Sequence, residues 1–351
     1  MNPKQLPGFV LPKNDDFPKR DLVRLMEKKS EKVLQRFGQV ITEGVTHPEL
    51  LSILNYLKGY WKERLRPALT CFSCEAVGGT QEMAEDAGLM FTLAAAGTQI
   101  HDEIIDKSSR NFFRKTIYGS RGVDHALLAG DLLIVKAWTM LRKMISGEEK
   151  LSKVVNIIEL YDLISVEICE AELQETSFRR KFDVTLQEYE NNFLWKINAD
   201  LEACAAAGAI LGGGSEIEVH VLADFGRRLG FIMGLHDDIM DSLNLKGNLI
   251  HRLKYESIPI PIIFALRSSD QNYLRVKSIL EKTPSTSSDV GELVEICFDS
   301  GAYNYVKDVA HRHAKIAQLN LEGLKPNTAR SNLELLAKKF FSDVANKCNR
   351  K

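Results

Sequence analysis

Two short stretches decide the fold: GTQIHDEIIDKSS at residues 97–109 and LHDDIMDSL at residues 235–243. Each contains two adjacent acids and a third acid three positions later, and each follows an apolar run, AAAGTQI in the first case and FIMGL in the second. Residues four apart lie on the same face of a helix, so Asp102 aligns with Asp106 and Asp237 with Asp241. The repeat predicts two acidic helix ends that face each other across one site.

Stacked carboxylates predict a divalent metal site. Like charges one turn apart destabilise a helix unless a cation lies between them. Oxygen ligands on one face suit Mg²⁺, which keeps several waters and binds substrate phosphates. We therefore expect a small cluster of Mg²⁺ around a diphosphate, held by Asp102, Glu103, Asp106, Asp237, Asp238 and Asp241.

Two other interpretations of the clusters remain open at this point. A single acidic cluster is commonly a solvated helix face, although the repeat and its apolar approaches argue against that explanation here. Both clusters also begin with a His-Asp pair, His101-Asp102 and His236-Asp237, as in HD-type phosphohydrolases. That class needs one such pair with further histidine ligands, whereas this chain doubles the pair and adds acids at helical spacing.

The rest of the chain shows helical periodicity. Apolar residues recur at intervals of three and four in LVRLMEKKSEKVLQRFGQVI (22–41) and in SKVVNIIELYDLISVEICEAEL (152–173). Strand-like alternation is nearly absent. We expect a proline-punctuated N-terminal arm at residues 1–20 and a single all-α domain at residues 21–351.

Composition excludes several function classes. The 351 residues are 44% hydrophobic and 26% charged with a net charge of −1, so bulk charge does not steer this chain to nucleic acid. The six cysteines are scattered, which favours thiols in a reducing compartment. The N-terminus lacks the apolar segment of a signal peptide, and no apolar run is long enough to span a bilayer. We expect a cytoplasmic protein without a transmembrane segment.

From about residue 30 onward the chain resembles the trans-isoprenyl diphosphate synthases, the polyprenyl synthetase family. The two acid clusters match the family's aspartate-rich motifs. ALLAGDLL (126–133) resembles its AGD segment, RLRPAL (64–69) its Arg-Pro segment and PIIFAL (261–266) the stretch after the second motif; Lys196 falls at its Lys-Thr pair. The resemblance implies an isoprenoid-synthase-type helical bundle around a central cavity, three Mg²⁺ and usually a homodimer.

The family's reaction ionises an allylic diphosphate, and isopentenyl diphosphate then attacks the cation. Cations that neutralise the leaving diphosphate and apolar walls that exclude water fit this chemistry. The resemblance makes Asp102, Asp106, Asp237 and Lys196 the expected catalytic residues. Basic residues expected to bind diphosphate are Arg66, Arg110, Arg114, Lys196, Lys246 and Lys254.

Five positions depart from the family pattern on the side that binds isopentenyl diphosphate. Glu63 replaces a lysine of the early motif, and a carboxylate there would repel a diphosphate. The other departures are Ala95, the pair Asn111-Phe112, Ile197 and Gly234. They favour a terpene-synthase-like lyase that ionises a prenyl diphosphate without this acceptor. A chain-elongating, geranylgeranyl-type synthase that uses Lys62, Arg66 and Arg114 is the alternative, and a regulatory subunit of such a synthase is a third.

The residues before Asp102 predict the length of the substrate. One helix face carries Phe91, Ala94, Ala95 and Thr98, with Phe91 as a floor about 16 Å from Asp102. An isoprene unit is roughly 4–5 Å long, so three to four units fit. We therefore expect a substrate of C15 to C20 or longer. On the second acidic helix, Gly226, Gly230 and Gly234 either widen this cavity or allow close helix packing. A lipid product of this kind also suggests peripheral contact with a membrane.

Overall fold

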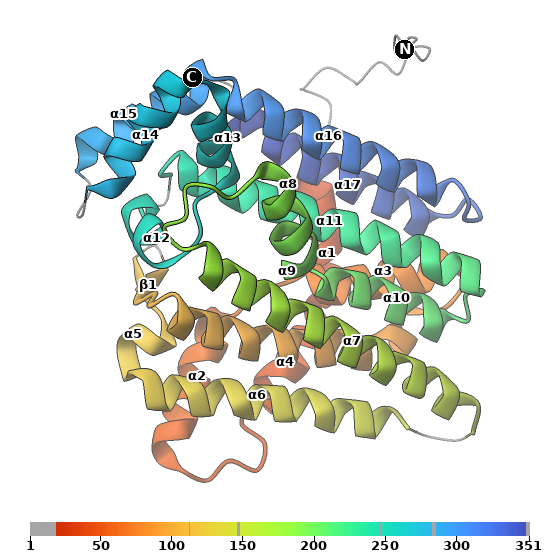
Figure 1. The fold of residues 1–351 in the computed structure, drawn as a ribbon. Helices are drawn as coiled ribbons and strands as arrows, with labels where there is room; N and C mark the ends of the chain where they lie inside the picture. Colours follow the sequence, from red (N-terminus) through yellow and green to blue (C-terminus); the bar gives the residue numbers. More distant parts are fainter. Residues whose placement is uncertain (1–18, 112, 146–147, 246, 283–285, 349–351) are drawn as a thin grey trace.

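The computed structural model describes residues 19–111, 113–145, 148–245, 247–282 and 286–348. These residues form a helical bundle (Figure 1). The only strands among them are β1 (Arg110–Asn111) and β2 (Arg114–Lys115), which pair as a short antiparallel hairpin. The prediction of an all-α fold is confirmed.

Among the described residues the first helix begins at Lys19, and helices follow one another with short connections. The first part contains α1 (Lys19–Val40), α2 (Pro48–Tyr60), α3 (Leu65–Ala76), α4 (Gln81–Ile105), α5 (Ile117–Arg121), α6 (Val123–Met144) and α7 (Glu148–Phe178). The middle part contains α8 (Leu186–Tyr189), the π-helical turn η1 (Glu190–Leu194), α9 (Trp195–Ile197), α10 (Asp200–Gly212) and α11 (Glu216–Ser242). The last part contains α12 (Leu249–Tyr255), α13 (Ile260–Ser268), α14 (Asp270–Glu281), α15 (Ser287–Asp299), α16 (Ala302–Leu321) and α17 (Thr328–Lys347).

Each acidic motif lies near the C-terminal end of a long helix, the first on α4 and the second on α11. The start of α11 is fixed by a capping box, in which the Ser215 hydroxyl accepts the Glu218 N–H and the Glu218 carboxylate accepts the Ser215 N–H. Gly213 precedes it with φ of +79°, a left-handed conformation that glycine adopts without strain. This turn therefore determines where α11 begins, and α11 then carries the second motif to the centre of the molecule.

Small residues let the helices approach closely. A Cβ on Gly97 of α4 would lie 2.8 Å from the Gly130 carbonyl oxygen of α6, so the two helices touch backbone to backbone there. Gly226 and Gly230 of α11 are equally tight, since added Cβ atoms would lie 2.3 Å and 2.5 Å from the carbonyl oxygens of Leu201 and Asn198. These two glycines serve helix packing, which was the second of the two interpretations left open for them.

Buried side chains form two main clusters. One joins α1, α3, α4, α6 and α10, and the other joins the C-terminal helices α13 to α16 with η1 and the later part of α11. The expected N-terminal arm at 1–20 lies almost wholly outside the described residues. Among the described residues, none of the helices is both long and apolar enough to cross a bilayer.

Candidate active site

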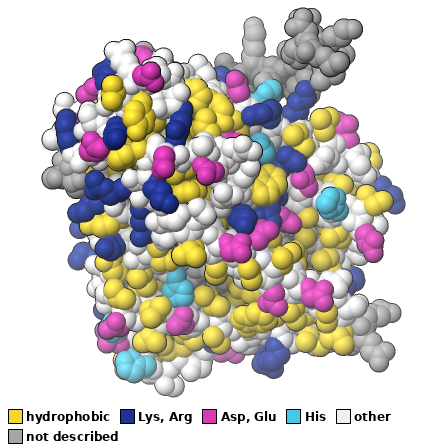
Figure 2. Space-filling model, in the orientation of Figure 1, with side chains coloured by type: hydrophobic (Ala, Val, Ile, Leu, Met, Phe, Trp, Pro, Cys, Tyr) yellow, Lys and Arg dark blue, Asp and Glu magenta, His cyan; other side chains and the backbone are white. Residues whose placement is uncertain are grey.

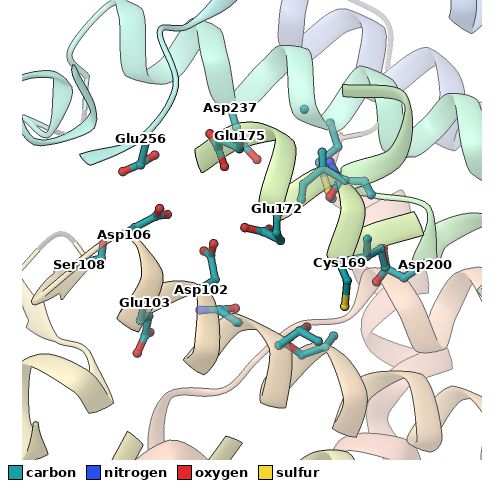
Figure 3. A pocket seen from close by; sticks show the side chains of 18 of the residues that line it. Asp102, Glu103, Asp106, Ser108, Cys169, Glu172, Glu175, Asp200, Asp237 and Glu256 are labelled. Atoms are coloured by element: carbon teal, nitrogen blue, oxygen red, sulfur yellow. The ribbon is translucent and has the colours of Figure 1, made fainter. Parts of the chain in front are cut away.

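A cavity of 1180 Å³ opens between α4, α7 and α11, with further walls from α6 and α12. Its two ends differ in chemistry. Most of the lining carboxylates, from α4, α7, α11 and the residue after α12, lie at one end, and apolar or aromatic side chains from α4, α6 and α7 line the other. Asp162 and Asp200 also line the cavity, with Asp200 apart from the acid group (Figure 3). Figure 3 shows the carboxylates of α4 and α7 turned toward the same open space. The two acidic motifs, far apart in sequence, are thus brought to one site.

All three acids of the first motif line the cavity, but their side chains take two directions. Asp102 and Asp106 line the cavity, and burial together with nearby carboxylates raises the pKa of Asp102 to about 7 and that of Asp106 to about 10. The side chain of Glu103 points away from them (Figure 3), and its Oε2 accepts the backbone N–H of Ile117 at 3.2 Å, at the start of α5. That Glu103 binds metal remains a prediction; in this structure its carboxylate bonds the turn that follows α4.

The three aspartates of the second motif differ in exposure and in bonding. Asp237 is half exposed and faces the cavity. Asp238 and Asp241 are 2% and 5% exposed, and both are bonded to Arg252 of α12, at 2.8 Å each. Burial raises the pKa of Asp238 to about 7, against the opposing effect of the Arg252 charge. All three aspartates line the cavity, and Asp237 is the most exposed of them.

Three further acids at the site were missed by sequence reasoning. Glu172 and Glu175 of α7 and Glu256, next to the end of α12, point into the cavity (Figure 3). One oxygen of Glu172 is buried with no hydrogen-bond partner in the described structure, and burial with the charge of Asp102 raises its pKa to about 9. Glu172 and Glu175 are three apart and share one face of α7, a spacing that is visible in the sequence. The pair lacks the adjacent acids that mark the two acidic motifs, so it does not stand out.

The predicted diphosphate-binding residues are only partly brought together. Arg110 lines the cavity at the hairpin. Arg66 also lines it, but its guanidinium is held by Asp200 and lies 3.8 Å from Glu63. Lys246 lies outside the described residues.

Three of the predicted basic residues do not line the cavity. The ammonium of Lys196 bonds Glu170 at 2.9 Å in a shallow surface groove on the outer side of α7. The guanidinium of Arg114 lies over the Tyr60 ring at 3.3 Å, and the ammonium of Lys254 lies 4.9 Å from the ring of Tyr255. The prediction that they bind diphosphate inside the cavity is not supported by these positions, because their helix or strand directs them outward.

The apolar end contains the predicted chain residues and two that were not predicted. Phe91, Ala94, Ala95, Thr98 and Gly234 all line the cavity. At its far end the Phe91 ring meets Tyr161 of α7, with centroids 6.4 Å apart, and Tyr161 meets Trp138 of α6 at 5.4 Å. Aromatic rings from three helices therefore form the floor.

Two independent helices give the same depth for this floor. Phe91 precedes Asp102 by eleven residues on α4, and Tyr161 precedes Glu172 by eleven on α7. At 1.5 Å per residue, each spacing is about 16 Å. On both α4 and α7, therefore, the acids lie at one end of the cavity and the aromatic floor lies about 16 Å away at the other.

Comparison with known proteins settles the family. The model of the polyprenyl synthetase family matches residues 47–297. The chain belongs to this family. It is an enzyme of the prenyltransferase kind, and the HD-type phosphohydrolase interpretation is wrong.

The relatives cover almost all of the chain. A short chain isoprenyl diphosphate synthase of Methanothermobacter thermautotrophicus is 29% identical over 322 residues, 90% of this chain and 97% of that protein. The solved geranylgeranyl pyrophosphate synthetase of Pyrococcus horikoshii is 26% identical, with a TM-score of 0.81 over 92% of this chain and 98% of that one. The corresponding enzyme of Geoglobus acetivorans is 25% identical, with a TM-score of 0.79 over 90% and 99%.

These relatives overturn the leading hypothesis of a terpene-synthase-like lyase that works without isopentenyl diphosphate. Proteins similar over nearly the whole chain are named as prenyl diphosphate synthases, not as lyases. The structure shows why the sequence argument failed at Glu63. Its Oε1 accepts the backbone N–H groups of Leu65 and Arg66 at 2.6 Å and 3.1 Å, at the start of α3. A carboxylate at a helix N-terminus is stabilised there, so Glu63 does not stand as a free charge opposite a diphosphate.

Proposed function

We propose that this polyprenyl synthetase is a chain-elongating prenyl diphosphate synthase that condenses an allylic diphosphate with isopentenyl diphosphate and makes a C20 product. The names of its full-length relatives support the reaction class. The observation that carries the proposal is the two-ended cavity, with carboxylates at one end and an aromatic floor at the other.

The carboxylates fit Mg²⁺. Asp102, Asp106, Glu172 and Asp237 face one space with few basic partners, and an orphaned oxygen on Glu172 lacks a donor. Among the described residues no three metal-binding side chains converge on a single point. That suits Mg²⁺, which binds through one or two carboxylates and completes its shell with water and substrate phosphates. Bound Mg²⁺ would supply positive charge to the leaving diphosphate. Three ions, as the resemblance implies, are part of the proposal.

The chain's own residues do the rest. Arg110, on the hairpin that borders the acid end, is placed to hold a phosphate. Beyond the acids, Ala94 and Ala95 leave room for the prenyl tail, and the apolar walls around it keep water from an allylic cation. The floor at about 16 Å admits three to four isoprene units of roughly 4–5 Å each, which sets the product near C20.

A homodimer is the second part of the proposal. Large apolar side chains are exposed along the outer faces of α6 and α7, including Leu128, Val135 and Leu163. Exposed apolar surface of this kind on neighbouring helices marks an interaction site, and a second copy of the chain is the partner that the family resemblance implies.

Peripheral contact with a membrane is the third part. Phe113 at the tip of the hairpin is 95% exposed, next to Arg110 and Lys115. Figure 2 shows Lys and Arg side chains gathered over the region of β1 and α12. Basic residues around an exposed aromatic ring suit an anionic lipid surface, where a prenyl product would be delivered. All six cysteines are free thiols, which suits the proposed cytoplasmic location.

The test is an incubation of the purified chain with Mg²⁺, farnesyl diphosphate and labelled isopentenyl diphosphate, followed by dephosphorylation and separation of the alcohols. Label in a C20 alcohol is the expected result. Hydrocarbon formed without the acceptor, or no incorporation of label with any allylic primer from C5 to C20, would overturn the proposal. An Asp102→Asn variant serves as the inactive control.

A further inference from the structure

A buried arginine from a neighbouring helix is bonded to two aspartates of the second acidic motif. Arg252 of α12 is 7% exposed, and its two terminal nitrogens donate to Asp241 Oδ2 and Asp238 Oδ1, both at 2.8 Å. Its Nε donates to the carbonyl oxygen of Ser257 at 3.3 Å. Glu175 and Glu256 lie further off, at 3.7 Å and 3.5 Å from the guanidinium. One cation thus contacts four carboxylates.

Each remaining oxygen of the two aspartates also has a donor. Asp238 Oδ2 accepts the backbone N–H of Ile260 at 2.9 Å, where α13 begins. Asp241 Oδ1 accepts the side-chain amide of Asn248 at 3.0 Å. A metal ion on either aspartate would therefore compete with an existing hydrogen bond and lie close to a like charge.

We infer that Arg252 is a built-in counter-cation that keeps metal off Asp238 and Asp241, so that metal reaches the second motif through Asp237 alone. The inference rests on the proposed function as a metal-dependent prenyl diphosphate synthase. Arg252 is a positioning residue in this account: it borders the cavity, but both terminal nitrogens are bonded to the two aspartates, and it decides how many carboxylates of the motif can bind metal.

The chain offers a matched control. Arg227 of α11 is also 7% exposed and is also held by two acids, Glu167 and Glu202, but it lies outside the cavity lining. Replacing either arginine with methionine removes one buried charge that is hydrogen-bonded to acids. Arg252 also has Glu175 and Glu256 nearby, whereas Arg227 has only its two acidic partners among the described residues. A general effect of losing a buried ion pair therefore appears in both variants, and an effect on metal binding only in Arg252→Met.

The experiment measures Mn²⁺ binding to the full chain by electron paramagnetic resonance of the free ion, with inorganic diphosphate present and no prenyl substrate. Arg252→Met is expected to bind one more Mn²⁺ per chain than the unmodified protein, or to bind its weakest ion at least about tenfold more tightly. Adding Asp238→Asn and Asp241→Asn should remove the gain, and Arg252→Lys should restore the original count. Arg227→Met should bind Mn²⁺ as the unmodified protein does.

Two outcomes would overturn the inference. One is an Arg252→Met protein that keeps its helical circular dichroism and an unchanged metal count and affinity. The other is such a folded variant that loses metal, which would mean that Arg252 orients Asp237. Should Arg252→Met fail to fold, the double variant Asp238→Asn with Asp241→Asn, which keeps Arg252, provides the test. An unchanged number of bound Mn²⁺ ions supports the inference, and loss of an ion overturns it. Because no turnover is measured, a chain that binds Mn²⁺ in this way but does not elongate would overturn only the proposed function.

Discussion

Replacing Phe91 with alanine should lengthen the product by about one isoprene unit. The ring closes the α4 side of the cavity about 16 Å from Asp102. The next residue on that helix face, one turn further, is Ala87, so α4 offers no second ring; the other rings of the floor, Tyr161 and Trp138, come from α7 and α6 and leave the α4 side open. Opening one turn adds about 5.4 Å, close to one unit of roughly 4–5 Å, so the main product is expected to move from C20 to C25.

The assay compares chain lengths of dephosphorylated products made from farnesyl diphosphate and labelled isopentenyl diphosphate. Leu89→Ala is the matched control, because Leu89 is fully buried on the same helix but does not line the cavity. Such a core truncation costs about 2–5 kcal/mol in stability and should leave the product at C20. An active Phe91→Ala enzyme with an unchanged product would refute the placement of the floor.

The opposite change tests the same geometry. Ala95 is seven residues before Asp102, about 10 Å along α4, and lines the cavity. A phenylalanine there should stop the chain after two to three units, at C10 to C15. Products that remain C20 in Ala95→Phe would mean that the tail takes another path.

The remaining predictions concern charge and assembly. Burial and neighbouring carboxylates raise the pKa of Asp102 to about 7 and of Asp106 to about 10, whereas carboxyl groups in the unfolded chain titrate near pH 4. The melting temperature of the metal-free protein should therefore fall as the pH rises from about 4 through 7 and on toward 10, and should recover with Mg²⁺ and inorganic diphosphate; a melting temperature independent of pH would contradict this. Lys196→Ala should change kcat/KM by no more than about twofold, because its ammonium lies outside the cavity, and a loss of about a hundredfold would show that it turns inward with substrate. Leu128→Glu with Leu163→Glu should give a folded monomer by light scattering, and a dimer that persists would place the interface elsewhere.

The fold could be predicted from the sequence because its signals are local. Helical periodicity and the repeated acid motif need only neighbouring residues, and the spacing from Asp102 to Phe91 gives a depth once the helix is assumed. The glycines of α11 could not be assigned from sequence, since cavity and packing are both compatible with small residues. The structure assigns Gly226 to helix packing, because a Cβ added there would lie too close to the Leu201 carbonyl oxygen.

The site was predicted less completely, because the position of a residue in a motif does not fix the direction of its side chain. Glu63 and Glu103 both fall in family motifs, yet each accepts backbone N–H groups at the start of a helix. Lys196 follows a π-helical turn and emerges on the outer side of α7. Arg252 and Glu172 carry no motif signal. They reach the acids only through tertiary packing, of α12 against α11 and of α7 against α10, α9 and η1.

The charge of the acid end ties metal binding to folding. The described carboxylates there outnumber their basic partners, Arg252 and Arg179, the second of which lies 3.4 Å from Asp106. Burial, together with the charges of neighbouring carboxylates, raises the pKa values of these acids, so without further cations some of them hold protons. Ligands that bring positive charge displace those protons and bind the folded chain in preference to the unfolded one, so the stabilisation grows with the logarithm of their concentration. Arg252 supplies part of that charge permanently, and the second motif can therefore stay ordered before metal and diphosphate arrive.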